Sequence, residues 1–509
     1  MSVLALAVAL CILASTWFKL RSRHRHQPPL PPGPPADPLI GHLRVIPTKD
    51  QGSVFHKWAQ TYGDVLYVNA LGRSMVILDS ITAATDLLEK RSSNYSDRPR
   101  FPVIELLGYD PNLVLMPYGD RFRKHRKIIH SNFTKRACLP WRDLQKDSAY
   151  NLALSLLDNG ENYDRLFSWF TTAVITKIAY GFDVKFEDDE YVQMAEHNGF
   201  VLNEPETAGG TVVDLLPFLR HFPSWFPGTQ AASFAREWRW AIRRLYDLPF
   251  EKVKREWDRG TAGPSLLAAE LAKLDGKEND EDLEDLKGAS AMAFIAGAET
   301  TWSALVIFLL AMVRHPDIQR RAQEEIDRVT GPDRLPDFSD QNSLPFVECL
   351  VQEVLRWHPV VPLGIPHRCM EEDIYRNMFI PKGSIVIANL HGMALDESVY
   401  SDPTSFNPSR FLPKPIGNEE PLFQAAFGFG RRACPGMHLA LAGLWIVMVT
   451  ILATADISKA TDKDGNTIEV EPDYTNGLAS RPKPFPCRIQ SRSEQRRDLL
   501  AKAIAASSK

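Results

Sequence analysis

Hydrophobic and polar positions follow two different periods along this chain. Residues 62–78 alternate apolar and polar side chains around a turn at residues 71–73, which predicts a β-hairpin that belongs to a small sheet. Residues 81–90 predict a short helix, and residues 150–260 are mostly helical by the spacing of their apolar positions. These patterns predict a helical region beside a small sheet.

Residues 289–313 form a mainly apolar run that is long enough to span a bilayer. Glu299, Thr300 and Thr301 lie at its centre, where polar groups are costly in lipid. A helix that is hydrophobic all round can equally be the buried axis of a large soluble domain. We therefore predict a core helix.

Three other segments stand out by their composition. Residues 95–118 are apolar and interrupted by prolines, and so long a segment predicts a functional loop. Residues 215–228 are rich in aromatic residues and prolines, which fits either a loop inserted into a membrane surface or a packed connection. Residues 275–285 are acidic, which suits both a helix N-terminus and a solvated loop.

The N-terminal residues carry the pattern of a membrane anchor. Residues 3–18 are almost wholly apolar, residues 19–26 are basic, and residues 27–38 form a proline-rich spacer. A signal-peptide core is the competing interpretation of so short an apolar run. Cleavage is disfavoured because no charge precedes the run, no small-x-small site is convincing, and the basic cluster comes after it. The positive-inside rule then predicts a single-span anchor (1–20), a hinge (21–43) and a cytosolic domain (44–509).

Composition and charge exclude several classes of protein. The length suggests about three domains, but no stretch resembles an internal linker, so we expect one large helical domain. A net charge of −4 gives no argument for nucleic-acid binding. The six cysteines form no C-x-x-C pair, which fits neither a zinc site nor a disulfide framework and suits a reducing compartment. The sequons at Asn94 and Asn132 should therefore stay unmodified in the cytosol.

The strongest chemical signal is the segment FGFGRRACPG at residues 427–436. It matches the pattern F-x-x-G-x-R-x-C-x-G at every fixed position and resembles the haem-binding loop of the cytochrome P450 family. An ordinary buried cysteine in a glycine-rich turn is the alternative interpretation. Five matched positions at fixed spacing disfavour that alternative.

The resemblance implies a role for each fixed position of this loop. Gly430 and Gly436 permit a tight turn that brings Cys434 close to a flat cofactor, and a thiolate ligand favours O–O cleavage at haem iron. Arg432 would pair with a haem propionate, because a planar guanidinium suits carboxylates. Phe427 would shield the sulfur from water, while neighbouring backbone N–H groups tune its charge.

The segment AGAETT at residues 296–301 resembles the oxygen-activation motif of the same family. The resemblance implies that Gly297 leaves room for O₂ and haem, that Thr300 hydrogen-bonds the bound oxygen, and that Glu299 relays protons from water. A threonine that bonds the carbonyl four residues earlier is the alternative for Thr300. That alternative does not explain the acid and the glycine together.

Residues 120–127, DRFRKHRK, resemble the W-x-x-x-R helix of the family, with Phe122 where Trp is usual. The resemblance implies that Arg126 contacts a haem propionate, whereas Phe122 has no N–H to donate. The other basic residues fit either a solvated helix face or a docking face for an acidic electron donor. His367 matches the position that commonly contacts the second propionate, with a purely structural histidine as the alternative.

Two motifs concern structure rather than chemistry. Glu353 and Arg356 form an E-x-x-R pair on one helix face, and residues 406–411, FNPSRF, resemble the P-E-R-F segment with Ser409 in place of Glu. The resemblance implies a buried charge network of Glu353, Arg356 and Arg410. Between these motifs, residues 361–368 contain a strand-like apolar stretch that would line the pocket.

These motifs occur in family order over essentially the whole chain, and their texture is similar to fungal microsomal P450s of secondary metabolism. The resemblance implies a mainly α P450 fold with a small β-rich region, in which residues 439–455 form a core helix beside haem b. It further implies insertion of one atom of O₂ into a lipophilic substrate at the endoplasmic reticulum, with electrons from NADPH through a P450 reductase. An O₂-independent isomerase or dehydratase and a non-catalytic haem carrier or sensor are the alternatives. Glu299 and Thr300 disfavour both.

Overall fold

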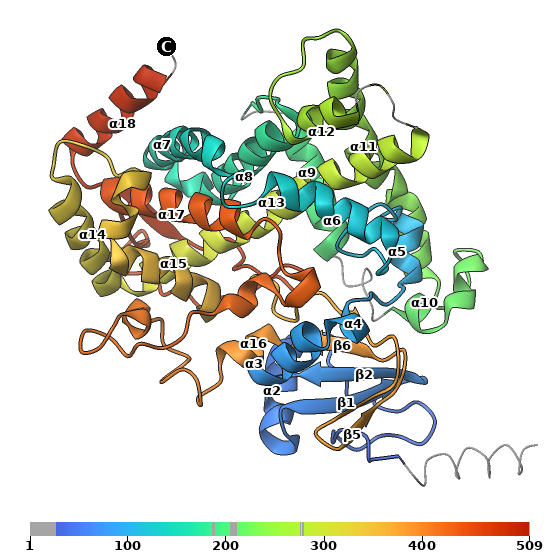
Figure 1. Cartoon of the computed structure of the whole chain (residues 1–509). Coiled ribbons are helices and arrows are strands. Elements are labelled where there is room, and N and C mark those ends of the chain that lie inside the picture. The colour runs from blue at the N-terminus through green and yellow to red at the C-terminus, as the bar shows by residue number, and fades with distance from the viewer. Residues whose placement is uncertain (1–26, 186–188, 204–210, 275, 277–278, 508–509) are drawn as a thin grey trace, which may run out of the picture.

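The computed structural model describes residues 27–185, 189–203, 211–274, 276 and 279–507. Helices make up most of this part, and a small sheet lies at one end of the molecule (Figure 1). The prediction of a mainly α fold with a small β-rich region is therefore confirmed. The predicted anchor at residues 1–20 and the basic start of the hinge lie outside the described residues.

The sheet joins residues 65–78 to residues 367–388, which are far apart in the sequence. Strands β1 (Val65–Ala70) and β2 (Arg73–Leu78) form the predicted antiparallel hairpin, with Leu71 and Gly72 at φ of 50° and 85° in the turn. Two positive φ values match the turn type whose twist suits a two-residue hairpin. Strand β6 (Ile385–Ala388) runs parallel to β2 (Figure 1), and β3 (His367–Arg368) pairs with β6 in the antiparallel direction.

Four further strands form two separate antiparallel pairs, which are β4 (Asp373–Tyr375) with β5 (Met378–Ile380) and β7 (Ala455–Lys459) with β8 (Cys487–Ser491). The prediction of a strand-like stretch at residues 361–368 is wrong for most of these residues. Only its last two residues form a strand, β3, because a turn at residues 361–364 interrupts it.

Helices pack beside this sheet and make up the rest of the molecule (Figure 1). They are α2 (Gln51–Tyr62), α3 (Ile81–Ala84), which continues as a π-helix (Thr85–Lys90), α4 (Ser92–Tyr95), α5 (Pro102–Leu107), α6 (Asp120–Asn132), α7 (Arg142–Asp158), α8 (Tyr163–Tyr180), α9 (Glu190–Asn203), α10 (Val212–Leu215), α11 (Gln230–Asp258), α12 (Leu266–Leu274), α13 (Asp280–Arg314), α14 (Pro316–Thr330), α15 (Pro345–Trp357), α16 (Leu390–Ala394), α17 (Met437–Thr454) and α18 (Glu494–Ser507). The short helix predicted at residues 81–90 is confirmed. The loop predicted at residues 95–118 needs correction, because it contains α5, which begins at a proline in its first turn.

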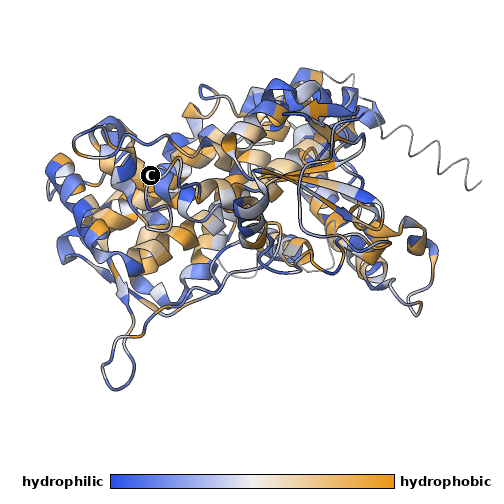
Figure 2. Ribbon diagram, turned by 90° about the horizontal axis from the view of Figure 1, so that it is seen from below, coloured by the Kyte–Doolittle hydropathy of each residue, from blue (hydrophilic) through white to orange (hydrophobic). Residues whose placement is uncertain are grey.

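The core is built around α13 and α17. Figure 2 shows that hydrophobic residues are concentrated on the inner helices of the molecule. Both helices are long and apolar enough to cross a membrane, but 67% and 72% of their most apolar windows are buried inside the fold. Their apolar side chains are therefore covered by other helices, as predicted for core helices. Helix α13 begins at a capping box, in which Asn279 and Asp282 bond each other's backbone N–H groups.

A buried charge network fastens residues 394–420 to α15, as predicted. Glu353 accepts hydrogen bonds from Arg356 (2.7 Å) and from Arg410 (3.0 Å), and all three side chains are fully buried. Arg410 also pairs with Glu420 at 2.7 Å, an acidic partner that the motif did not identify. Arg356 donates to the carbonyls of Ala394 and Pro403 at 2.8 Å. The network therefore ties the irregular backbone of residues 394–420 to α15, in addition to the hydrogen bonds that this segment makes within itself.

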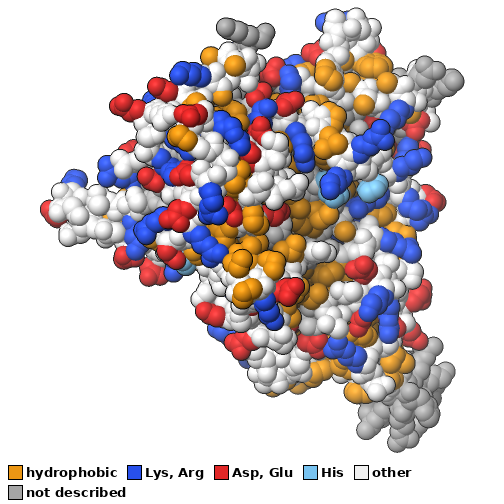
Figure 3. All heavy atoms as spheres, turned by 60° about the vertical axis from the view of Figure 1, so that its left-hand side comes forward, with side chains coloured by type: hydrophobic (Ala, Val, Ile, Leu, Met, Phe, Trp, Pro, Cys, Tyr) orange, Lys and Arg blue, Asp and Glu red, His pale blue; other side chains and the backbone are white. Residues whose placement is uncertain are grey.

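The surface shows no separation of charge on the face seen in Figure 3. Lys, Arg, Asp and Glu side chains are interspersed there, and hydrophobic side chains gather near its centre. This mixture agrees with the small net charge of the chain.

Candidate active site

Cys434 lies in the loop that leads into α17. Its backbone N–H donates to the carbonyl of Phe427 at 2.7 Å, and its side chain is accessible. Burial of the loop raises the pKa of the Cys434 thiol, while N–H groups of Gly436 and Met437 and the Arg126 guanidinium act in the opposite direction. These donors favour a thiolate, which is the form that ligates metals.

Two glycines of the loop are required by its shape. Gly428 and Gly430 have φ of 74° and 54°, and a Cβ on Gly430 would lie 2.4 Å from the carbonyl oxygen of Leu88. Gly430 therefore lets the loop pack directly on the π-helix. Gly436 was also expected to need a backbone conformation that only glycine adopts easily. Its φ of −87° is one that other residues adopt as well, so that expectation is wrong.

Arg126 and Arg432 both lie beside this loop. Arg126, on α6, donates to the carbonyl of Ala433 at 2.6 Å. Arg432 donates to the carbonyls of Ser96, Leu113 and Met116 at 2.7, 3.1 and 2.8 Å. Its guanidinium also stacks 3.7 Å from the centre of the Phe122 ring. The aromatic face of Phe122 thus contributes to the site although it lacks the N–H of tryptophan.

A third arginine, Arg98, joins this group and was missed by sequence reasoning. It is buried and donates to the carbonyls of Val114, Ile365 and Pro366 at 2.7–2.8 Å. Burial, followed by the nearby Arg432, holds the pKa of Arg98 well below its usual range. The signal in the sequence was a pair of arginines, at positions 98 and 100, inside an otherwise apolar segment.

His367 lies at the edge of the same group. Its Nδ1 is 2.6 Å from the carbonyl of Tyr95, so a neutral ring would donate its proton there. Burial first, and then Arg98, lower the pKa of His367 well below its ordinary value. A neutral histidine with Nδ1 engaged leaves Nε2 as its remaining polar atom.

The charges of this group test whether a haem fits. Arg98, Arg126 and Arg432 are largely buried, and among the described residues the acid that favours the charged forms of Arg98 and Arg432 is Asp97. Asp97 itself pairs with Arg368. Buried cations that lack acidic partners are costly, so a ligand that brings carboxylates beside the Cys434 thiol complements the site. The residues therefore fit haem.

The two residues predicted to act on oxygen lie in the middle of α13. The Thr300 hydroxyl donates to the carbonyl of Ala296 at 2.7 Å, which is the arrangement of the alternative interpretation. Its oxygen retains lone pairs that can accept a proton donor. Glu299 is buried and accepts a hydrogen bond from Arg481 at 2.5 Å. Arg481 comes from the C-terminal segment, and no motif pointed to it.

Arg481 belongs to a small cluster around Trp302. Its guanidinium lies 3.5 Å from the centre of the Trp302 ring, whose Nε1 donates to Asp164 at 2.9 Å. Burial raises the pKa of Asp164, and Arg481 and Trp302 act against that shift. The cluster connects α13 to the start of α8 and to the C-terminal segment.

Gly297 has a different role from the one expected. A Cβ at this position would lie 2.6 Å from Cγ1 of Ile175 on α8. The glycine therefore permits close packing of α8 on α13, and its predicted role in leaving room for O₂ and haem is not what the contacts show.

The basic residues of α6 and the acidic start of α13 pair with each other. Lys124 bonds Asp282 and Asp285, and Arg121 and His125 also bond Asp285. Although burial acts to raise it, these partners lower the pKa of Asp285 to about 2. Part of the basic face is therefore neither simply solvated nor free for docking.

Comparisons with known proteins agree with this geometry. The family model described as cytochrome P450 matches residues 31–487. A cytochrome P450 monooxygenase of Postia placenta is 36% identical over 98% of this chain and 95% of its own length. Others from Armillaria gallica and Coprinopsis cinerea are each 37% identical over 97% of this chain, and over 98% and 95% of their own lengths. The chain therefore belongs to the cytochrome P450 family and is a P450 monooxygenase.

Proposed function

We propose that this monooxygenase binds haem b through Cys434 and oxidises a lipophilic small molecule, by hydroxylation or a related reaction, in secondary metabolism. The observation that carries the proposal is the accessible Cys434 thiol, placed between backbone N–H donors and a buried group of guanidinium ions. When bound, the haem would supply O₂ activation. Electrons would come from NADPH through a cytochrome P450 reductase.

The residues around Cys434 would hold the cofactor. Arg126, Arg432 and His367 would bind its propionates, and Arg98 lies where it can do the same. Phe427 would shield the sulfur and hold the loop through its carbonyl. The proposed propionate contacts follow from charge. The buried arginines have few acidic partners among the described residues, and each propionate would neutralise one of these arginines.

Product formation tests the function against its alternatives. Purified protein with a P450 reductase is supplied with extracts of lipophilic metabolites, and consumption of each compound is followed. A monooxygenase requires both NADPH and O₂. An isomerase or dehydratase would form product without them, and a carrier or sensor would form none.

Thr300→Ala is expected to uncouple the enzyme. We propose that Thr300 positions a proton donor through its lone pairs and that Glu299 supplies the proton, so product formation per NADPH should fall. Loss of a positioned proton-transfer group typically costs about 10²- to 10⁴-fold in the dependent step. NADPH consumption should persist while hydrogen peroxide accumulates, which an NADPH, peroxide and product balance measures.

Two control variants make this test specific. Thr300→Ser keeps the hydroxyl and should retain most of the coupling, and Thr301→Ala, about 100° further round the helix, should have a smaller effect. If Thr300→Ala forms as much product per NADPH as the wild type, Thr300 has no part in proton transfer and only bonds the carbonyl of Ala296 within the helix.

We also propose that residues 1–20 anchor the enzyme in the endoplasmic reticulum membrane with its catalytic domain in the cytosol. The segment at residues 215–228 supports membrane contact, because Phe218, Phe222 and Trp225 are 57%, 37% and 79% exposed. The contacts of the two sequon asparagines support a catalytic domain on the cytosolic side, where they would carry no glycan. Asn94 Nδ2 donates to the carbonyl of Glu371 at 3.0 Å and Asn132 Nδ2 to Glu270 at 2.6 Å, so a glycan on either nitrogen would disrupt these contacts.

A chain that begins at Pro28 is expected to bind haem as the full chain does but to associate less with membranes. The fraction that sediments with microsomes measures this. Residual association should fall further when Phe218, Phe222 and Trp225 are replaced together by serine, because exposed aromatic side chains favour the membrane interface. Unchanged sedimentation of the shortened chain, or N-glycans on Asn94 or Asn132 in the native protein, would contradict the proposed topology.

A further inference from the structure

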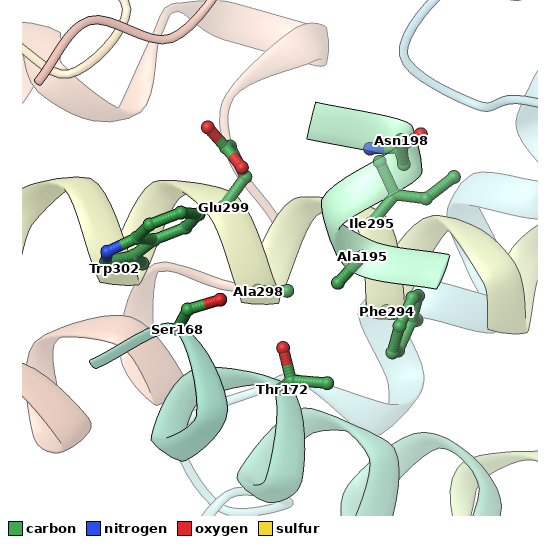
Figure 4. A pocket seen from close by; sticks show the side chains of 9 residues that line it. All are labelled: Ser168, Thr172, Ala195, Asn198, Phe294, Ile295, Ala298, Glu299 and Trp302. Atoms are coloured by element: carbon green, nitrogen blue, oxygen red, sulfur yellow. The ribbon is translucent and has the colours of Figure 1, made fainter. Parts of the chain in front are cut away.

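A small cavity lies between α8, α9 and α13 (Figure 4), and Thr300 is not among the residues that line it. Its volume is about 10 Å³, and its lining is formed by Ser168, Thr172, Ala195, Asn198, Phe294, Ile295, Ala298, Glu299 and Trp302. A single water needs about this much space and two to four polar partners. Ile295, Glu299 and Trp302 share one face of the helix by their spacing, whereas Thr300 is turned about 100° from Glu299.

Thr172 points its hydroxyl into this cavity without a protein partner. The side chain is fully buried, and among the described residues its Oγ1 has no hydrogen-bond partner. Figure 4 shows the oxygens of Thr172 and Ser168 turned toward the space beneath Ala298. A buried hydroxyl that lacks a partner is destabilising, so a bound molecule at this position would relieve that cost.

The orientation of Thr172 is not the usual one for a buried hydroxyl in a helix. The adjacent Thr171 donates to the carbonyls of Phe167 and Ser168 at 3.1 Å, and Ser303 on α13 donates to that of Glu299 at 2.9 Å. Serine and threonine within helices commonly bond back in this way. Thr172 instead keeps its hydroxyl free for a group inside the cavity.

The wall formed by α9 and Glu299 supplies the other polar partners. Asn198 Oδ1 accepts a hydrogen bond from the Tyr109 hydroxyl at 2.7 Å, which fixes the amide with its nitrogen on the side of Glu299 (Figure 4). The Glu299 carboxylate lies against the same helix, because a Cβ on Gly199 would come within 3.0 Å of its Oε2. Arg481 binds the other oxygen, Oε1.

We propose that this cavity is a built site for one water molecule, held by Thr172 and Ser168 on one side and by the wall of Asn198 and Glu299 on the other. The water keeps Glu299 hydrated on the face of α13 turned away from Thr300. A hydrogen bond from this water would help to fix the orientation of the Glu299 carboxylate, to which the proposed function gives a part in proton transfer. This role rests on the proposed function, whereas the water site itself does not.

The first test is a high-resolution crystal structure of the haem-loaded protein and of its Thr172→Val variant. We expect density for one water within hydrogen-bond distance of Thr172 Oγ1 in the wild type and its loss in the variant. Valine has nearly the shape of threonine, so the cavity walls should not move. An empty cavity in the wild type would overturn the proposal.

Thermal stability gives an independent readout. If water occupies the site, Thr172→Val removes one of its partners and should lower the melting temperature. Thr176→Val is the matched control: its hydroxyl is also fully buried without a partner among the described residues, but it does not line the cavity. That variant should keep or raise the melting temperature. An equal or raised melting temperature in Thr172→Val would indicate a dry cavity and overturn the proposal.

The catalytic consequence is tested separately. Thr172→Val should lower product per NADPH, by less than Thr300→Ala does, and should enlarge the effect of D₂O on product formation. A wild-type protein that holds the water yet forms no product with NADPH and O₂ would defeat the proposed function alone. If the wild type holds the water and Thr172→Val still forms as much product per NADPH as the wild type, the water has no role toward Glu299.

Discussion

Cys434→Ala should abolish the red-shifted Soret band of the reduced, carbon monoxide-treated enzyme. That band requires a thiolate ligand to haem iron, and Cys434 is the cysteine that the structure places among donors able to stabilise a thiolate. Alanine also removes the contact through which the loop would hold the cofactor. We expect little or no stable haem in the purified variant, measured by the ratio of haem to protein absorbance, and no product.

Cys369→Ala is the matched control for this experiment. Cys369 is buried, its thiol donates to the carbonyl of Glu371 at 2.7 Å, and burial raises its pKa to about 11. Its thiol is therefore held neutral, and its replacement should leave the Soret band intact. If the band survived Cys434→Ala and disappeared in Cys369→Ala, Cys369 would be the iron ligand and the assignment to Cys434 would be wrong.

Features of the backbone that are local in the chain could be predicted from the sequence. The loop at residues 427–436 needs Gly430 because of its positive φ, a requirement that lies in the local backbone. The same holds for the hairpin of β1 and β2, whose turn and alternation lie in one segment. Local geometry leaves a pattern that a single sequence can reveal.

Contacts between distant segments left no such pattern. Arg481 completes a charge group whose other members, Glu299 and Asp164, lie far away in the chain, and any surface arginine would look the same in the sequence. Gly297 was assigned to the wrong neighbour for a related reason. The motif specifies a missing side chain, but only packing shows that Ile175 of α8 fills the space.

The network around Glu353 should show the largest effect on folding. Glu353→Gln preserves the shape of the side chain but removes the negative charge that faces Arg356 and Arg410, both fully buried. Breaking a buried ion pair by removing one partner typically costs about 3–5 kcal/mol of the free energy of unfolding, because the remaining charge is left without compensation. Here two guanidinium ions lose their shared acid, and Glu420 compensates only Arg410.

Asp143→Asn provides a control with the same spacing in the chain. Asp143 and Lys146 also form an acid–base pair three residues apart on a helix, but the Asp143 side chain is 88% exposed. Exposed pairs contribute about 0–1 kcal/mol, so this variant should unfold at nearly the same denaturant concentration as the wild type. Glu353→Gln should unfold much earlier, followed by circular dichroism, and should yield less haem-loaded protein. If both variants unfolded alike, the buried network would add nothing to stability, and residues 394–420 would have to be held by their backbone contacts alone.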